Sequence, residues 1–240
     1  MIFPVEIINL HFKYPESKIE SKAESKTINK ANLLNGIELQ INKGEVCAIV
    51  GLSGCGKSTL CYCICGIIPH VLDGEMQGEV LVFGDSTKNM KLPNISTRVG
   101  IVFQDPDTQL FSPTVEDEIA FGPENLCLDR EEIGKRISEN LTLVKMEKNR
   151  YASPENLSGG EKQLIALAST LSLNPEIIIF DEAMSQIDDS GKLNIKKAIK
   201  DLKNAGKTII MVEHDLKNLD IADRVMLLKD GKLASFKGSF

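Results

Sequence analysis

A glycine-rich stretch constrains this chain more than any other feature. It reads Gly51-Leu52-Ser53-Gly54-Cys55-Gly56-Lys57-Ser58-Thr59 and directly follows the short apolar run Val46–Val50. Such a run predicts a buried central strand, and the stretch is expected to open a helix. Glycines let the backbone curl so that successive N–H groups face a phosphate, and the helix N-terminus adds positive charge. The pattern therefore predicts a nucleotide phosphate site, with Lys57 at the β/γ-phosphates and Ser58 on Mg²⁺.

A second pattern places acids at the end of an apolar strand. The run Ile177–Phe180 leads into Asp181 and Glu182, and open α/β sheets bind ligands where strands end. Asp181 is suited to hold Mg²⁺ through water, and Glu182 to orient or deprotonate the water that attacks a γ-phosphate. His214, after the next run, is placed to hydrogen-bond that phosphate. Read alone, such acids and a single histidine are often structural, so their assignment depends on the glycine-rich stretch.

The remaining runs predict an α/β fold. Val5–Tyr14 and Leu33–Ile41 are expected strands around a solvated Ser/Lys/Glu-rich loop, 16–30. Short apolar runs that alternate with helical patterns predict a parallel core, and they are Val80–Phe83, Val99–Phe103, Ile177–Phe180, Ile209–Val212 and Val225–Leu228. Between them, helical periodicity over Val115–Phe121 and Glu131–Val144 predicts an inserted helical lobe at about 105–158, within one domain spanning 1–240.

Composition limits the classes of function. The net charge of −6 and the absence of a basic patch argue against nucleic acid as a partner. No apolar run is long enough to cross a bilayer, so a soluble, cytosolic chain is expected. Cys61, Cys63 and Cys65 lie two apart on a predicted helix, where Cys63 points away from the other two. Buried reduced thiols are therefore favoured over a three-ligand metal site.

A third motif opens another predicted helix. It runs Leu157-Ser158-Gly159-Gly160-Glu161-Lys162-Gln163, and read alone it is a helix cap. Ser158 lies 23 residues before Asp181, and Lys57 lies 124 residues before the same aspartate. With these motifs the chain resembles, over nearly its full length, the nucleotide-binding subunits of ATP-binding-cassette (ABC) proteins.

The resemblance implies an α/β fold with a phosphate-loop NTPase core, a predominantly parallel sheet, an N-terminal antiparallel β lobe and an inserted helical lobe. It implies ATP and Mg²⁺ as cofactors and a head-to-tail dimer, with an identical or paralogous ATPase subunit. The signature residues would then act in trans on the partner's nucleotide, and they are Leu157, Ser158, Gly159, Gly160, Glu161 and Gln163.

Three further positions take roles from the same resemblance. Gln104 matches the glutamine that senses Mg²⁺ and the attacking water and couples to a membrane subunit. Asp188 matches the loop that crosses the dimer interface. Tyr14 matches the aromatic residue that stacks on adenine, although a tyrosine at a strand end is more often a core or edge residue.

A finer resemblance lies in the segments 102–111 and 114–125, which are similar to those of energy-coupling-factor importers. That group implies uptake of a vitamin or transition-metal ion, integral membrane partner subunits and a peripheral place at the cytoplasmic face of a prokaryotic membrane. Leu110, Phe111, Ile119 and Phe121 would suit a groove for a partner helix. Composition alone favours these four side chains as the lobe's own core.

Departures from the family pattern leave some points open. Leu164 stands where an Arg is usual, and Met184 where Thr or Ser is common. The chain ends at Phe240, where relatives continue, so it is interpreted as one half of a fused two-cassette protein or a trimmed chain. The main alternative function is a soluble ABC ATPase of translation or repair. A regulatory switch without turnover is disfavoured because Glu182 and His214 are both present.

Overall fold

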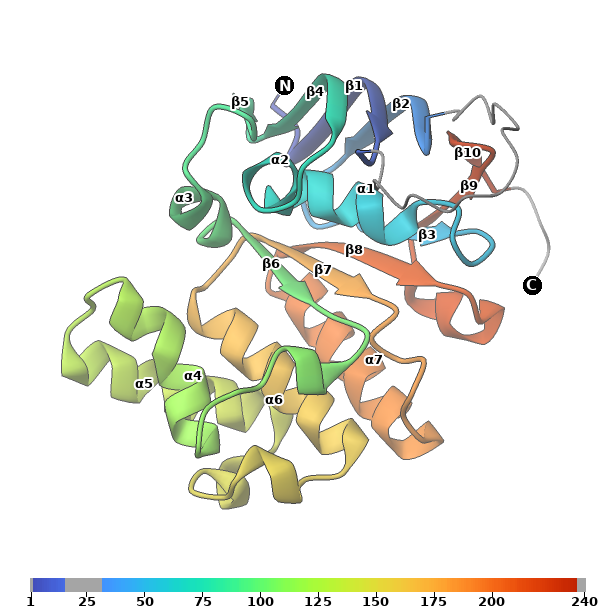
Figure 1. Cartoon of the computed structure of the whole chain (residues 1–240). Helices are drawn as coiled ribbons and strands as arrows, with labels where there is room; N and C mark the ends of the chain where they lie inside the picture. Colours follow the sequence, from blue (N-terminus) through green and yellow to red (C-terminus); the bar gives the residue numbers. More distant parts are fainter. Residues whose placement is uncertain (1, 16–31, 237–240) are drawn as a thin grey trace, which may run out of the picture.

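The structure is a computed structural model that describes residues 2–15 and 32–236 (Figure 1). The predicted loop at 16–30 and the chain end at Phe240 lie outside the described residues. Two sheets and two groups of helices are stacked, with the antiparallel sheet at the top of Figure 1, the parallel sheet in the middle and the larger helices below. This arrangement confirms the predicted α/β class.

The upper sheet is antiparallel throughout. Its strand order is β2 (Leu34–Ile41), β1 (Val5–Lys13), β4 (Glu75–Val82) and β5 (Asp85–Ser86). The expectation that Val80–Phe83 belongs to the parallel core is wrong, because Val80 pairs antiparallel with Ile7 of β1. Only the end of β4 is apolar, and its first five residues alternate between exposed and half-buried. A short apolar run of this kind carries no signal that distinguishes the two sheets.

The central sheet holds the buried strands. Its order is β10 (Lys232–Ser235), β9 (Arg224–Lys229), β3 (Val46–Val50), β8 (Thr208–Glu213), β7 (Ile177–Asp181) and β6 (Val99–Val102). All neighbours are parallel except β10 and β9. The strands β3, β7 and β8 are buried along their whole length, as expected for a sheet covered on both faces.

Two hydrophobic cores lie on the two faces of this sheet. On β3, Cys47 and Ile49 face the core shared with the antiparallel sheet, whereas Ala48 faces the core of the larger helices. Helices α1 (Lys57–Ile64) and α2 (Ile67–His70) lie between the two sheets, and α3 (Leu92–Ser96) leads into β6.

The lower layer contains four longer helices. They are α4 (Val115–Asn125), α5 (Arg130–Val144), α6 (Gly159–Ser172) and α7 (Asp189–Asn204). In the described part of the chain, 3₁₀ turns link several of these elements, namely η1 (Pro106–Thr108), η2 (Glu147–Asn149), η3 (Pro154–Asn156) and η4 (Leu216–Ile221). The predicted pair of lobe helices is present as α4 and α5, and α4 continues through Pro123 beyond the predicted end.

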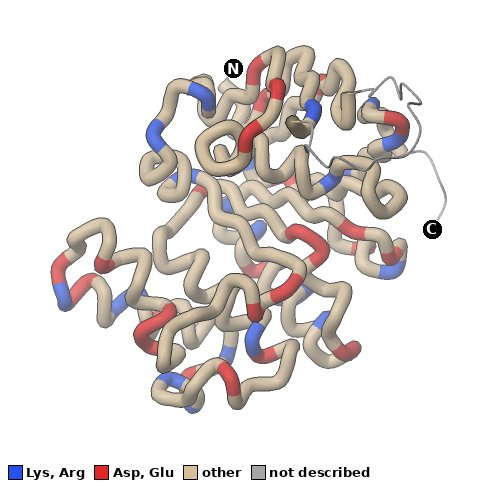
Figure 2. Tube along the Cα trace, viewed as in Figure 1, with Lys and Arg blue, Asp and Glu red and all other residues tan. Residues whose placement is uncertain are grey.

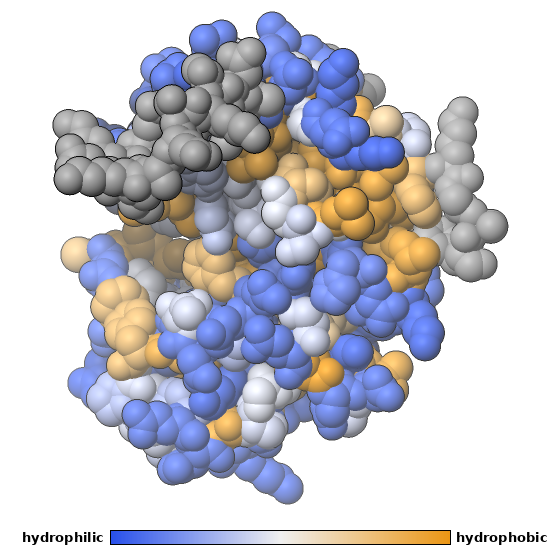
Figure 3. Space-filling view, turned by 45° about the vertical axis from the view of Figure 1, so that its right-hand side comes forward, coloured by the Kyte–Doolittle hydropathy of each residue, from blue (hydrophilic) through white to orange (hydrophobic). Residues whose placement is uncertain are grey.

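The surface shows how these layers meet solvent. Acidic and basic residues are interspersed along the described trace (Figure 2). On the face seen in Figure 3 the lower half, which holds the helices, is mostly hydrophilic, and hydrophobic residues gather mainly in the upper half. Helices α4, α5 and α7 thus bury one side and expose another, as expected for amphipathic helices, whereas α6 is buried along most of its length.

Candidate functional site

The glycine-rich stretch forms a tight loop between β3 and α1. A Cβ on Gly51 would lie 2.4 Å from the Leu228 carbonyl oxygen, so only glycine fits there. Gly54 and Gly56 have φ angles of 76° and 105°, in the region that favours glycine. Lys57 is the first residue of α1 and is 4% exposed. The loop and the helix N-terminus therefore have the geometry of a phosphate cradle.

The Lys57 ammonium group points back into this loop. Its Nζ donates to the carbonyls of Gly51 at 3.0 Å and Leu52 at 3.1 Å. The same Nζ lies 3.3 Å from Oε1 of Glu182. The phosphate loop and the end of β7 are thus joined by a single buried cation, although their residues are far apart in the sequence.

Two acids follow each other where β7 ends. The Ser58 hydroxyl donates to Oδ1 of Asp181 at 3.0 Å, and burial raises the pKa of Asp181 above its usual value. Glu182 has a left-handed φ of 51°, and its N–H donates to the Val212 carbonyl at 3.1 Å. His214 Nδ1 lies 3.6 Å from Oε2 of Glu182. Because β3, β8 and β7 are neighbours in the sheet, the glycine-rich loop, His214 and the two acids meet at the carboxyl ends of these strands.

Lys57, Ser58 and Glu182 line a cavity of about 350 Å³, whereas Asp181 and His214 are not among its described lining residues. It is lined by Leu33, Ser53, Gly54, Gly56, Lys57, Ser58, Thr59, Gln104 and Glu182. The Gln104 amide donates to Oγ of Ser185 at 3.3 Å. The Tyr14 hydroxyl lies 3.1 Å from Oγ1 of Thr59, which places the ring beside the start of α1. Leu33 was not predicted to lie at the site, because it belongs to no recognisable motif.

The signature motif begins α6 and does not line this cavity. Among the described residues around the cavity, none comes from 157–163. Ser158 is the N-cap of α6 and forms a reciprocal capping box with Glu161, whose pKa is lowered by hydrogen bonds from Ser158. A Cβ on Gly160 would lie 3.7 Å from Oδ1 of Asp188, the N-cap of α7. The signature and the predicted dimer loop therefore adjoin each other.

Three residues of this region face inward. Gln163 is fully buried, and its Nε2 donates to the Phe103 carbonyl at 2.7 Å, so its side chain serves its own chain. Leu164 is 5% exposed and Met184 is 1% exposed, and both pack in the core of the larger helices. The departure at Leu164 thus replaces a polar group with apolar packing.

A second, apolar cavity lies between the helical lobe and the sheet. It is about 530 Å³, and its lining includes Phe103, Phe111 and Phe121. Phe111 and Phe121 are 66% and 46% exposed and meet edge-to-face at 4.7 Å. Ile119 is fully buried and Leu110 packs against the core, so both belong to the lobe's own core. We call this cavity the apolar groove.

The cysteines of α1 are inside the protein. Burial raises the pKa of the Cys61 thiol, and it raises those of Cys63 and Cys65 to about 12. Thiols with such pKa values stay protonated at neutral pH, as is typical of buried structural cysteines. In residues 2–15 and 32–236, no cluster of three or more His, Cys, Asp or Glu is arranged to bind a metal.

The fold and the site define a phosphate-loop NTPase of the α/β class. Residues 34–185 match the ABC transporter family, and the chain therefore belongs to that family. The predicted class of ABC-type ATPase is confirmed, and ATP binding is a property of this class. Within the described part of the chain, no helix combines the length and apolarity needed to span a bilayer.

Several relatives cover most of the chain. The energy-coupling factor transporter ATP-binding protein EcfA of Methanococcus maripaludis is 41% identical over 95% of this chain and 77% of that protein. The EcfA of Methanosarcina acetivorans is 44% identical over 83% and 72%. The structure of cbiO1 from Clostridium perfringens, part of the ABC transporter complex cbiONQ, superposes with a TM-score of 0.81 at 29% identity, over 98% of this chain and 88% of that one.

The chain is shorter than some of its relatives. An ABC transporter ATP-binding protein of Methanosarcina acetivorans is 48% identical over 83% of this chain, yet the chain spans 32% of its length. For a second such protein, of Methanosarcina mazei, the chain spans 38% of the length.

Proposed function

We propose that this chain hydrolyses ATP to power an importer of the energy-coupling-factor type. The observation that carries the proposal is the meeting of Lys57, Gln104 and Glu182 in one cavity at the end of the central sheet. In this proposal Lys57 neutralises phosphate charge, the Gln104 amide contacts Mg²⁺ and the attacking water, and Glu182 accepts a proton from that water. The two EcfA relatives support the importer class.

The residues present also fit Mg²⁺. Mg²⁺ prefers hard oxygen ligands and is usually held by one or two protein groups together with substrate phosphates and water. Ser58 and Asp181 supply such oxygens 3.0 Å apart, and Ser58 and Gln104 both line the nucleotide cavity. Bound there, Mg²⁺ would neutralise charge on the β- and γ-phosphates. Glu182 would then accept the proton of the attacking water, while His214 hydrogen-bonds the γ-phosphate.

The signature residues support action as a dimer. Ser158 and Gly160 lie outside the chain's own nucleotide cavity, at the N-terminus of α6, where free N–H groups favour a phosphate. We infer that they close the nucleotide site of a second ATPase subunit in head-to-tail arrangement, with Asp188 at the interface. The 32% and 38% coverage of two relatives is compatible with the 240 residues being one cassette of a fused pair.

The apolar groove supplies the contact to the membrane partner. Phe111 and Phe121 are exposed although they are aromatic, and such a patch is suited to the apolar face of a helix. An integral membrane subunit at the cytoplasmic face of a prokaryotic membrane would provide that helix. By likeness to the energy-coupling-factor group, the transported solute would be a vitamin or a transition-metal ion, and Tyr14 would stack on adenine.

The proposal is tested by measuring MgATP binding and hydrolysis by the full chain. Calorimetry should show binding that Lys57→Ala largely abolishes, because the ammonium group makes a charge-assisted contact that water cannot replace in a closed site. Co-purification with an integral membrane protein should accompany hydrolysis. Unchanged affinity in Lys57→Ala would remove the phosphate site, and failure of the chain to co-purify with any integral membrane protein would favour a soluble ABC ATPase.

A further inference from the structure

Two glutamine side chains bind both polar groups of Phe103. Gln163 of α6 is fully buried, and its Nε2 donates to the Phe103 carbonyl at 2.7 Å. Gln109, which follows η1, accepts from the Phe103 N–H through Oε1 at 3.1 Å. The backbone is therefore fixed on both sides of Phe103, immediately before Gln104.

The same contacts attach this backbone to α6. The side-chain Nε2 of Gln109 donates to Oγ1 of Thr170 at 3.1 Å. Thr170 lies about two helical turns after Gln163 in α6. Near the start of α6, Lys162 forms an ion pair with Asp107 of η1 at 2.6 Å. The helix that begins with the signature motif thus contacts the segment 103–109 at Phe103, Asp107 and Gln109.

This backbone separates the two cavities of the molecule. Phe103, Gln109 and Thr170 line the apolar groove, whereas Gln104 lines the nucleotide cavity. A single peptide bond therefore joins a residue of the groove to a residue of the nucleotide site. A shift of the Phe103 carbonyl group carries the backbone nitrogen and Cα of Gln104 with it, because the peptide unit is planar and nearly rigid.

Packing alone does not account for an amide at position 163. Among the described residues, Oε1 of Gln163 has no hydrogen-bond partner although the side chain is fully buried. An unpaired buried carbonyl destabilises the folded state, whereas an apolar side chain of the same shape would not. The compensating feature is the bond from Nε2 to the Phe103 carbonyl.

We propose that Gln163 and Gln109 are positioning residues for ATP hydrolysis. They fix the Phe103–Gln104 peptide so that the Gln104 amide stays at the nucleotide cavity, and they link that peptide to α6. Among the described residues that line the cavity, neither glutamine is present, so both act through Gln104. The inference rests on the proposed role of Gln104 in hydrolysis.

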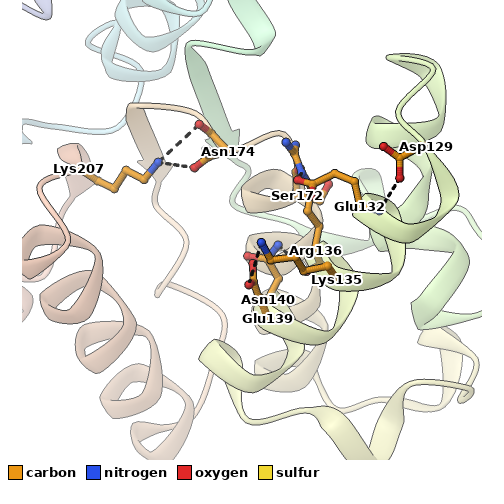
Figure 4. Close-up of polar contacts among 9 residues, drawn as sticks. All are labelled: Asp129, Glu132, Lys135, Arg136, Glu139, Asn140, Ser172, Asn174 and Lys207. Atoms are coloured by element: carbon orange, nitrogen blue, oxygen red, sulfur yellow. Dashed lines mark hydrogen bonds and ion pairs between the residues drawn. The ribbon is translucent and has the colours of Figure 1, made fainter.

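The test compares Gln163→Met and Gln109→Met with a control variant, Arg136→Met, which removes a side chain that contacts the other end of α6. Arg136 of α5 donates from Nη1 to the Ser172 carbonyl at 2.7 Å, at the opposite end of α6 (Figure 4). Arg136→Met therefore loosens α6 without touching Phe103. For each variant of the full chain, calorimetry measures MgATP affinity, steady-state kinetics measure kcat, and calorimetric melting measures Tm.

Both glutamine variants should lower kcat about tenfold, as for other groups that orient a catalytic residue, with MgATP affinity within about twofold of wild type. Gln163→Met should lower Tm only slightly, because the lost bond to the Phe103 carbonyl is offset in part by removal of the unpaired Oε1. The double variant should lose little more than either single one, since both act on one peptide. Arg136→Met should lower Tm and leave kcat near wild type.

Wild-type kcat in Gln163→Met and Gln109→Met, in a chain whose wild type hydrolyses ATP, would overturn this inference and leave the proposed function intact. An equal loss of kcat in Arg136→Met would also overturn it, because the effect would then follow from loosening α6. A wild-type chain with no turnover would instead overturn the proposed function and the inference together.

Discussion

At the scale of the residue, Glu182 combines an unusual backbone with an aimed side chain. Its φ of 51° is in the left-handed region, which costs a non-glycine residue about 1 kcal/mol. The hydrogen bond from the Glu182 N–H to the Val212 carbonyl holds this conformation, and Oε1 of Glu182 forms an ion pair with Lys57. Backbone strain of this kind at the end of a strand is typical of functional sites.

We therefore predict that Glu182→Gln binds MgATP and hydrolyses it at least ~100-fold more slowly, because a positioned proton acceptor is lost. With ATP no longer turned over, the closed dimer should persist. Single-turnover assays measure the rate, and size-exclusion chromatography with MgATP should show a dimer for this variant. Normal turnover would remove Glu182 from the role of base.

At the scale of the element, the N-cap of α6, Ser158, can stabilise its own helix or contact the nucleotide of a partner subunit. Ser158 closes the capping box with Glu161, and it also stands at the free N-terminal end of the helix. The bulky acid in Ser158→Glu would repel the phosphate of a partner's nucleotide. We predict that ATP binding by the isolated subunit is kept and hydrolysis is abolished. If calorimetry shows that binding is lost to the same degree, Ser158 supports its own fold instead.

An ion pair between Glu116, in the first turn of α4, and Arg150 predicts that the stability of the protein depends on pH. Arg150 makes two hydrogen bonds to Glu116, at 2.8 and 3.0 Å, and they lower the pKa of Glu116 below its usual value. A lowered carboxyl pKa in the folded state adds stability above the unfolded pKa, and this contribution disappears as the pH falls through the folded pKa.

Glu116→Gln should therefore reduce the free energy of unfolding by about 1 kcal/mol at neutral pH, as for a partly exposed bidentate pair. The difference from wild type should shrink in acid, below the usual range of a glutamate pKa. Urea titrations at neutral and acidic pH measure both values, with Glu139→Gln as a control for an exposed pair of 3.9 Å. A constant difference across pH would contradict the assignment.

At the scale of the whole molecule, the apolar groove distinguishes a transport motor from a soluble ATPase. Phe111 is 66% exposed, so Phe111→Asp should leave Tm and basal hydrolysis nearly unchanged. Placing a carboxylate in an apolar contact should cost several kcal/mol of binding, because the group loses its water shell. Pull-down by a tagged membrane component should therefore fail. Retained pull-down would place the coupling surface elsewhere.

Ile119→Asp is the matched contrast, since Ile119 belongs to the same helix as Phe121 but is fully buried. It should unfold the lobe, with a large fall in Tm. The two variants together separate a surface role from a core role, which composition alone could not do.

The sequence by itself determined the features that depend on neighbouring residues. The loop at Gly51–Thr59, the buried strands β3, β7 and β8 and the cap of α6 follow from local patterns, because turns, caps and apolar runs are encoded within a few residues. Family membership and the choice of Lys57, Asp181 and Glu182 as candidates came from those same patterns.

Tertiary structure alone decided what depends on contacts between distant segments. The strand order brings Glu182 to Lys57, the pairing with β1 moves Val80 into the antiparallel sheet, and packing separates buried Ile119 from exposed Phe111. The inward position of Gln163, within a motif assigned to the partner's nucleotide, belongs to the same group. The physical reason is that burial and strand pairing are set by all the packed layers together, so that no short stretch of sequence records them.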